Sequence, residues 1–313
     1  MSGTGTSSSS QPLTTMPKAG LAYALCAVMI WTGFILVSKA GALAALATPD
    51  LIMVRFGTAF MLFSPFIWRH RNVICQWRMA VLGSIGGLAY ALSVFTGFAH
   101  APATHAALLL PGLMPIMIAV FAYFVAGERH KMSSWLGIAV SSLGIAALLI
   151  ETLLVDNRYW FGDVSFIVAC VCWGIFTVLL RRWQFAPWHA TLGIITVTTL
   201  LFTPVYVFWL PHNLSEASWQ MLGLQAFYQG VMATTIQMVL YGRAVHLIGA
   251  TRMGGLMALV PVFASVLAVP LFNEQWTPGL TIALLLILAG TLISNFPVRS
   301  VTGKWRRKSS CTA

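Results

Sequence analysis

The dominant pattern along the chain is a series of apolar runs separated by short polar segments. A helix needs about 20 consecutive apolar residues to cross a bilayer, which is the length of most of these runs. The pattern predicts an all-α integral membrane protein with ten transmembrane helices. The predicted spans are 19–38, 50–68, 79–99, 102–126, 132–150, 163–181, 189–210, 219–242, 251–272 and 277–297.

Two of these runs, within 102–128 and 248–274, share an unusual design. Each contains a proline that stands 13 residues before a closing glutamate, and a glycine recurs at a matched place in the run that follows. Three anchors at one offset predict an internal repeat. The matched pairs, each separated by 146 residues, are Pro115 and Pro261, Glu128 and Glu274, and Gly144 and Gly290.

The repeat divides the chain into two halves of five spans each. Residues 18–150 form the first repeat and residues 163–298 the second, joined by a polar linker loop at 151–162. A disordered tail, 1–17, precedes them, and a basic tail, 299–313, follows. Because five is odd, the second repeat must enter the membrane from the opposite side, and inverted repeats of this kind are a recurrent design of secondary transporters.

Charge sets the expected orientation. Of the 18 lysines and arginines, all but Lys39, Arg55 and Arg158 fall on one side of the ten-span topology. The positive-inside rule therefore places both termini in the cytoplasm of a cell inner membrane. Composition agrees: 58% of the residues are hydrophobic and only 8% charged, against about 25% in soluble domains. The net charge of +11 then reflects topology rather than nucleic-acid binding.

No pattern in the chain indicates catalytic chemistry. The five cysteines form no CxxC pair, and neither a His-Glu metal motif, a phosphate loop nor a nucleophile elbow occurs. We therefore expect no catalytic residue, no metal and no cofactor.

Several motifs, in order, resemble those of EamA-type proteins of the drug/metabolite transporter superfamily. The resemblance covers residues 18–298 and implies ten helices in two EamA repeats that export or exchange small metabolites, often amino acids. The motifs that carry it are Trp31-Thr-Gly-Phe34 with Lys39, Pro49 with Arg55, the two Pro…Glu helices, Trp173-Gly174, and Tyr241-Gly-Arg243 before Gly249-Ala250-Thr251.

Scattered polar and aromatic side chains inside the spans are candidates for a substrate cavity, with hydrogen bonding between helices as the alternative. Helical spacing places Gln237 about 80° away from Gln229, so only a broad cavity could include both. The candidates are Trp31, Tyr90, Ser93, Trp173, Tyr228, Gln229 and Gln237.

Prolines and charges provide further candidates. Pro115 and Pro261 would act as hinges, or else pack as simple kinks. Lys39 and Arg55 would form a gate or an ion pair, with Asp50 as a partner for Arg55. The glutamates that close the two Pro…Glu helices would be interfacial anchors or caps of the next helix, with proton coupling as the alternative, and His100 and His105 would be loop residues.

The sequence therefore predicts a secondary transporter that exports or exchanges a small organic metabolite, an amino acid or similar amphipathic compound, by alternating access. The alternatives are a scramblase-like lipid-handling protein and a non-transport membrane enzyme. The expected partners are a small-molecule substrate and the lipid bilayer, without nucleic acid, and no pattern specifies an oligomeric state.

Overall fold

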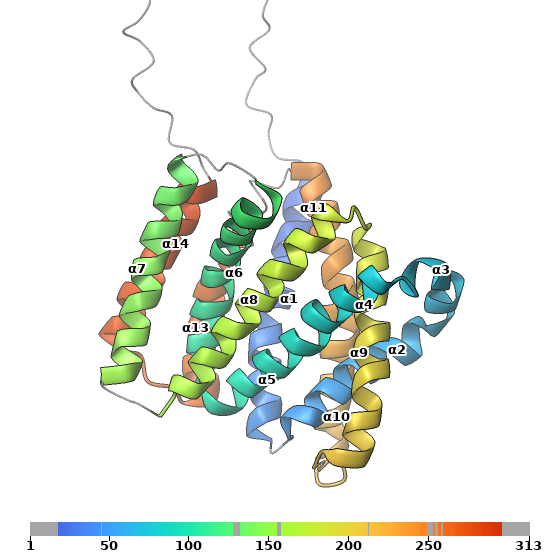
Figure 1. Cartoon of the computed structure of the whole chain (residues 1–313). Helices are drawn as coiled ribbons and strands as arrows, with labels where there is room; N and C mark the ends of the chain where they lie inside the picture. Colours follow the sequence, from blue (N-terminus) through green and yellow to red (C-terminus); the bar gives the residue numbers. More distant parts are fainter. Residues whose placement is uncertain are drawn as a thin grey trace, which may run out of the picture.

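A computed structural model describes residues 18–44, 46–127, 132–154, 158–211, 213–248, 253, 256–257 and 259–295. All regular secondary structure within these ranges is helical (Figure 1). The helices are α1 (Lys18–Leu43), α2 (Thr48–Arg69), α3 (Arg71–Ile74), α4 (Trp77–Gly83), η1 (Ser84–Ala89), α5 (Tyr90–His100), α6 (Ala103–Ala126), α7 (Met132–Leu154), α8 (Trp160–Arg182), α9 (Pro187–Trp209), α10 (Trp219–Gln225), η2 (Ala226–Ile236), α11 (Gln237–Ile248), α13 (Leu259–Phe272) and α14 (Pro278–Asn295).

Six helical stretches in the described chain are long and apolar enough to cross a membrane. These are α1, α2, the continuous unit Trp77–His100, α6, α8 and α9. Shorter apolar stretches lie in α7, α13 and α14. The chain is therefore a multi-pass membrane protein, as its apolar runs predict.

The outer surface of the bundle is apolar, as lipid contact requires. Large hydrophobic side chains such as those of Met61 and Phe124 are more than 70% exposed. Exposed tryptophans mark both ends of the bundle, with Trp68 near the end of α2 and Trp219 at the start of α10. Tryptophan is enriched at both membrane–water interfaces, so the helices have the girdle expected of a bilayer-spanning bundle.

Two of the helical units contain π-helical segments, η1 and η2. Glycines let both segments approach their neighbours closely: a Cβ on Gly86 or Gly87 would clash with Phe176 or Thr198, and one on Gly230 would lie 3.0 Å from Thr58 Cβ. A π turn adds a residue to the helical turn, so side chains on either side of it leave the usual 100° spacing.

The helices α7 and α14 pack against each other through matched glycines. A Cβ on Gly144 would lie 2.9 Å from the Ala283 carbonyl oxygen, and one on Gly290 would lie 2.5 Å from the Gly137 carbonyl oxygen. The offset of 146 residues converts one pair into the other. The contact is therefore reciprocal, and the two helices run antiparallel.

The centre of that contact falls on a pair with the same offset. The Ser141 hydroxyl lies 3.5 Å from the Ile287 carbonyl oxygen, 146 residues further along the chain. The repeat-related helices α6 and α13 also pack on each other. Repeat-related elements thus meet around a local two-fold axis.

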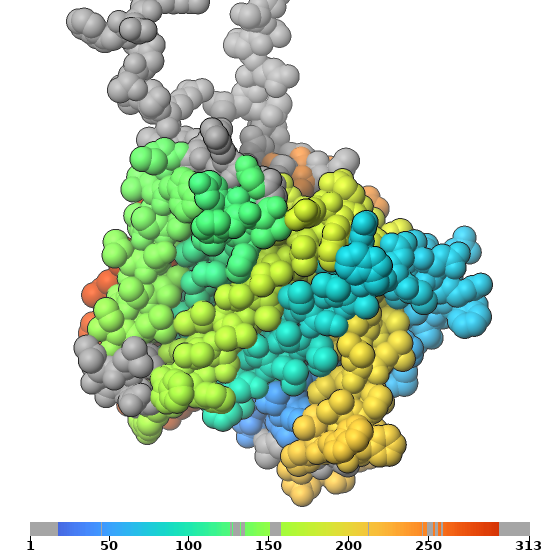
Figure 2. Space-filling view, viewed as in Figure 1, coloured from blue at the N-terminus to red at the C-terminus, as the bar shows by residue number. Residues whose placement is uncertain are grey.

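The chain enters and leaves the bundle at one end. The start of α1 and the end of α14 both lie at the upper end in Figure 1. Figure 2 shows α8 running obliquely across one face of the molecule, and α8 packs mainly between α6 and α5. We call the end that holds the start of α1 and the end of α14 the terminal end, and the other the distal end.

Candidate functional site: a central cavity and its closed end

A cavity of about 910 Å³ lies in the middle of the bundle. Both repeats line it, with α1, α2, η1, α5 and α6 from the first and α8, α9, η2, α11, α13 and α14 from the second. Aromatic, methionine and aliphatic side chains make most of its wall. Largely apolar pockets with a few polar groups are typical of sites for small organic molecules.

The cavity reaches the terminal end of the bundle but not the distal end. On the terminal side its lining includes Leu180 near the end of α8, Pro187 at the start of α9 and Thr291 in the last turns of α14. On the distal side the lining stops at Phe34 and Pro111, several residues short of the helix ends. The structure is therefore in a state that opens toward the terminal end.

Phenylalanine rings in edge-to-face contact close the cavity on the distal side. The Phe34 and Phe98 rings meet edge to face with centroids 6.0 Å apart, and the Phe98 and Phe166 centroids are 5.2 Å apart. Phe98 and Phe166 are fully buried. These three side chains form a hydrophobic floor between the cavity and the distal end.

Arg55 lies at the inner end of the cavity. Its Nη1 donates to Gln229 Oε1 at 3.2 Å, and Gln229 Nε2 donates in turn to Ser38 Oγ at 2.8 Å. The suggested pair with Asp50 is wrong: Asp50 accepts from the Tyr206 hydroxyl at 2.7 Å. Asp50 is N-terminal in α2 and reaches α9, whereas Arg55 lies more than a turn further along and faces the cavity.

Other predicted residues meet at the cavity wall. With its amide oriented so that both atoms are satisfied, Gln237 accepts from the Trp31 indole Nε1–H and donates to the Ala27 carbonyl oxygen at 3.2 Å. Tyr90 packs on Trp173 with ring centroids 5.1 Å apart. All four predicted residues, Trp31, Tyr90, Trp173 and Gln237, line the cavity.

Four predicted site residues do not line the cavity. Ser93 donates to the Ala89 carbonyl oxygen of its own helix, and Tyr228 donates to the Ile30 carbonyl oxygen of α1 at 3.3 Å. Gln229 lies behind Arg55, and Lys39 lies at the distal end. Gln229 and Gln237 lie on different faces, and Gln229 is held against Arg55 and Ser38, so only Gln237 lines the cavity.

Both hinge candidates line the cavity. Pro115 lies in the middle of the 24-residue α6. Pro261 lies in the first turn of α13, and the residues before α13 are only partly described.

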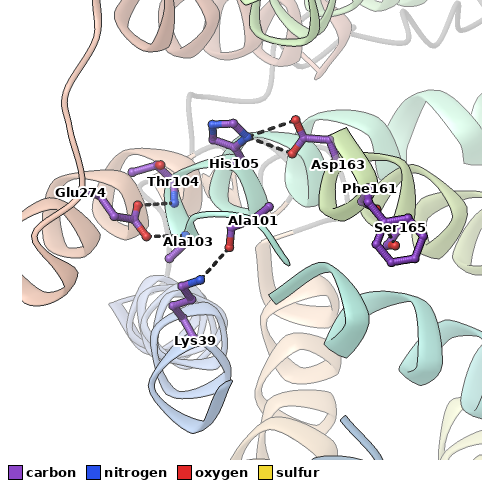
Figure 3. A network of polar contacts seen from close by, with 9 residues as sticks. All are labelled: Lys39, Ala101, Ala103, Thr104, His105, Phe161, Asp163, Ser165 and Glu274. Atoms are coloured by element: carbon purple, nitrogen blue, oxygen red, sulfur yellow. Dashed lines mark hydrogen bonds and ion pairs between the residues drawn. The ribbon is translucent and has the colours of Figure 1, made fainter. Parts of the chain in front are cut away.

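The distal end is held by a polar network (Figure 3). Lys39 donates to the carbonyl oxygens of Phe98 at 3.1 Å and Ala101 at 2.8 Å, which caps the end of α5. Glu274 accepts from the backbone N–H groups of Ala103 at 2.6 Å and Thr104 at 2.9 Å, at the start of α6. Glu274 thus caps a helix of the other repeat, not the next helix; its repeat partner Glu128 lies outside the described residues.

A second carboxylate, that of Asp163, contacts the other repeat in the same region. His105 Nδ1 lies 2.9 Å from Asp163 Oδ1, and Asp163 is almost fully buried. His105 is therefore not a loop residue but a member of the first turn of α6. Asp163 is not among the site residues predicted from the sequence, although an acidic residue at the edge of an apolar span is itself a signal.

Three carboxylates therefore join the two repeats at the distal end: Asp50, Asp163 and Glu274. A carboxylate that accepts hydrogen bonds from N–H or O–H donors is a strong, charge-assisted contact. We call these three residues and their partners the distal latch.

The family model of the EamA-like transporter family matches residues 18–150 and 160–296, which is nearly the whole bundle. The chain belongs to the EamA-like transporter family. The two matched segments correspond to the two repeats, so the resemblance seen in the sequence motifs is confirmed.

Relatives of this EamA protein include several curated bacterial proteins. Uncharacterized transporter YoaV of Bacillus subtilis (strain 168) is 23% identical over 58% of this chain and 63% of its own length. Uncharacterized transporter YyaM of the same strain is 23% identical over 60% of this chain and 63% of its own length. The matches thus span less than two thirds of these relatives. A solved crystal structure at 21% identity has a TM-score of 0.60 over 90% of this chain and 97% of that chain, which shows the fold alone.

These comparisons and the apolar helices identify a multi-pass membrane protein of the EamA-like transporter family. Both the family and these relatives are named as transporters.

Proposed function

We propose that this EamA protein is a secondary carrier that exports or exchanges a small organic metabolite by alternating access through the central cavity. The observation that carries the proposal is the asymmetry of that cavity. It is lined by both repeats and reaches the terminal end, while the hydrophobic floor and the distal latch close the other end.

The repeat relation supplies the conformational change. In the proposed topology ten crossings form two five-helix repeats of opposite orientation, consistent with the antiparallel, reciprocal contact of α7 and α14. Exchanging the conformations of two inverted repeats turns a cavity open at one end into a cavity open at the other. Under the positive-inside rule the terminal end is cytoplasmic, and the structure corresponds to an inward-open state of an inner-membrane protein.

Counterflow in proteoliposomes tests the carrier function. Vesicles loaded with a panel of aromatic acids, amino acids and amines should accumulate the matching labelled compound faster than empty liposomes, for at least one member. Protein recovered from the vesicles should keep its cooperative thermal unfolding. A folded protein that exchanges no member of a broad panel would contradict the proposal.

A reporter at the C-terminus tests the topology. A cytoplasm-specific reporter fused after residue 313 should be active, and a periplasm-specific one inactive. The opposite pair of results would overturn the orientation and the assignment of the cavity opening.

A further inference from the structure

The cavity wall carries one charged side chain among the residues described, that of Arg55. Its guanidinium carbon lies 5.1 Å from the centroid of the Phe34 ring and 5.4 Å from that of Phe56. Nη1 of Arg55 donates to Gln229, whereas Nε is buried and has no hydrogen-bond partner in the described chain. A cation with an unused donor therefore lies at the inner end of an apolar space.

The acidic side chains that the structure describes lie away from the cavity. Asp50, Asp163 and Glu274 belong to the distal latch, and Glu216 is exposed in the connection before α10. No aspartate or glutamate lines the cavity within the described ranges. A buried charge without a counter-charge is costly, and the contacts of Arg55 with two aromatic rings and one amide offset that cost only in part.

We propose that the cavity binds a small organic monoanion, with a carboxylate or similar group on Arg55 and an apolar body against the aromatic wall. The planar guanidinium presents paired donors that match a carboxylate. Tyr90 lines the same cavity as Arg55, and its phenol carries a hydroxyl donor. The hydroxyl is thus a second donor beside the anion site.

The remaining wall specifies the body of the ligand. Trp31, Met114, Trp173 and Phe176 line the space around Arg55, and the cavity of about 910 Å³ holds a molecule with one aromatic ring or more. An amine would lose its hydration without gaining an acidic partner from the cavity wall. The inference rests on the proposed carrier function and deepens it, because it ranks acids above amino acids and amino acids above amines.

Equilibrium binding to the purified full chain tests this ranking. Isothermal titration with phenylacetate, phenylalanine and phenethylamine should give the tightest binding for phenylacetate. The expected preference over phenethylamine is about tenfold or more, the scale of one charge-assisted contact. Equal or tighter binding of phenethylamine would overturn the proposal.

Two substitutions assign the preference to Arg55. Arg55→Gln should weaken phenylacetate binding about tenfold or more and leave phenethylamine binding unchanged or improved. Gln229→Glu keeps the arginine but places a carboxylate where Arg55 Nη1 now donates at 3.2 Å, so it should compete with the ligand and give the same loss. Arg71→Gln, the same change on an exposed arginine next to Trp68, is the matched control and should change nothing.

The outcomes separate the two proposals. Acid-selective binding that Gln229→Glu abolishes, without counterflow of any compound, would support the anion site and contradict the carrier. Counterflow of amines as fast as acids, unchanged in both cavity variants, would support the carrier and overturn the anion site. Should Arg55→Gln fail to fold, Gln229→Glu decides the question alone, because it is nearly isosteric and retains the buried cation.

Discussion

The two ends of the bundle differ in how they use polar side chains. At the terminal end the helices part around a cavity whose wall is mostly apolar, although most of the lysines and arginines that the structure describes lie near helix ends on that side. At the distal end, three of the seven acidic residues of the chain bind across the repeat boundary. The difference teaches that, among the described residues, the carboxylates that join the two repeats lie at the closed end, and none lines the cavity.

That arrangement suits a two-state carrier. Each latch contact is polar and joins one repeat to the other. A few such contacts, each of about 1–3 kcal/mol, are enough to bias an equilibrium between two access states. The following variants weaken the distal end in steps.

The largest effect is expected for Glu274→Gln. The change removes the charge that accepts from Ala103 N–H at 2.6 Å and Thr104 N–H at 2.9 Å, at a cost of about 2 kcal/mol. The distal end should open more often, by a factor on the order of ten. Labelling of Ala101→Cys by a membrane-impermeant maleimide would measure this.

Glu216→Gln is the matched control for that variant, because Glu216 is exposed at the same end and lies outside the latch. It should leave the labelling rate unchanged. An equal effect of both substitutions would mean that surface charge alone, and not the cap on α6, sets the rate.

His105→Ala should cost about 2 kcal/mol of stability, because it leaves the buried Asp163 carboxylate without its partner at 2.9 Å. The double variant His105→Ala with Asp163→Val should lose less, about 1 kcal/mol, since no charge stays buried. Thermal unfolding in detergent gives both values. A double variant less stable than the single one would show that the pair does not act as a unit.

Tyr206→Phe should lower the free energy of unfolding by about 1 kcal/mol, which is less than the loss expected for His105→Ala. It removes one neutral donor at 2.7 Å from Asp50, which keeps the Asn213 N–H at 3.0 Å. Thermal unfolding in detergent would measure this loss. In the folded variant, Ala101→Cys should also react slightly faster with the maleimide. No change in either quantity would remove Asp50 from the latch.

The smallest effects should come from the paired prolines. Pro115→Ala and Pro261→Ala should each slow counterflow a few-fold and shift cysteine labelling in opposite directions, because the two prolines belong to inverted repeats. Pro65→Ala, at an exposed position inside α2, is the control. Normal transport and unchanged labelling in both variants would show that the two prolines only pack as kinks and do not act as hinges.

The sequence predicted the all-helical, multi-pass character because continuous apolar runs are what a bilayer demands. Six helical stretches of the described chain are long and apolar enough to span, whereas the predicted number of ten stays a prediction. The sequence also placed Trp31, Tyr90, Trp173 and Gln237 on the cavity. It could not place Ser93, Tyr228 and Gln229 correctly. The hydroxyls of Ser93 and Tyr228 bond to backbone carbonyl oxygens instead, and Gln229 bonds to Arg55 and Ser38.

The distal latch was beyond sequence reasoning for a different physical cause. Glu274 accepts from backbone N–H groups 170 and 171 residues away. Every residue except proline has a backbone N–H, so the pattern of side chains does not show which N–H groups a distant carboxylate will bind. The pair of His105 and Asp163 likewise depends on how α6 and α8 cross. Contacts between repeats follow from packing, whereas the spans follow from local composition.

The central claim is that the cavity opens at one end while the latch closes the other. Paired labelling tests it most directly, with Thr177→Cys on the cavity wall and Ala101→Cys at the distal end, each in a background without other cysteines. We predict that an impermeant maleimide reaches residue 177 only from the cytoplasmic side, and that residue 101 is protected until Glu274→Gln exposes it from the opposite side. Free labelling of residue 101 in the otherwise native protein, with residue 177 protected from both sides, would contradict the account.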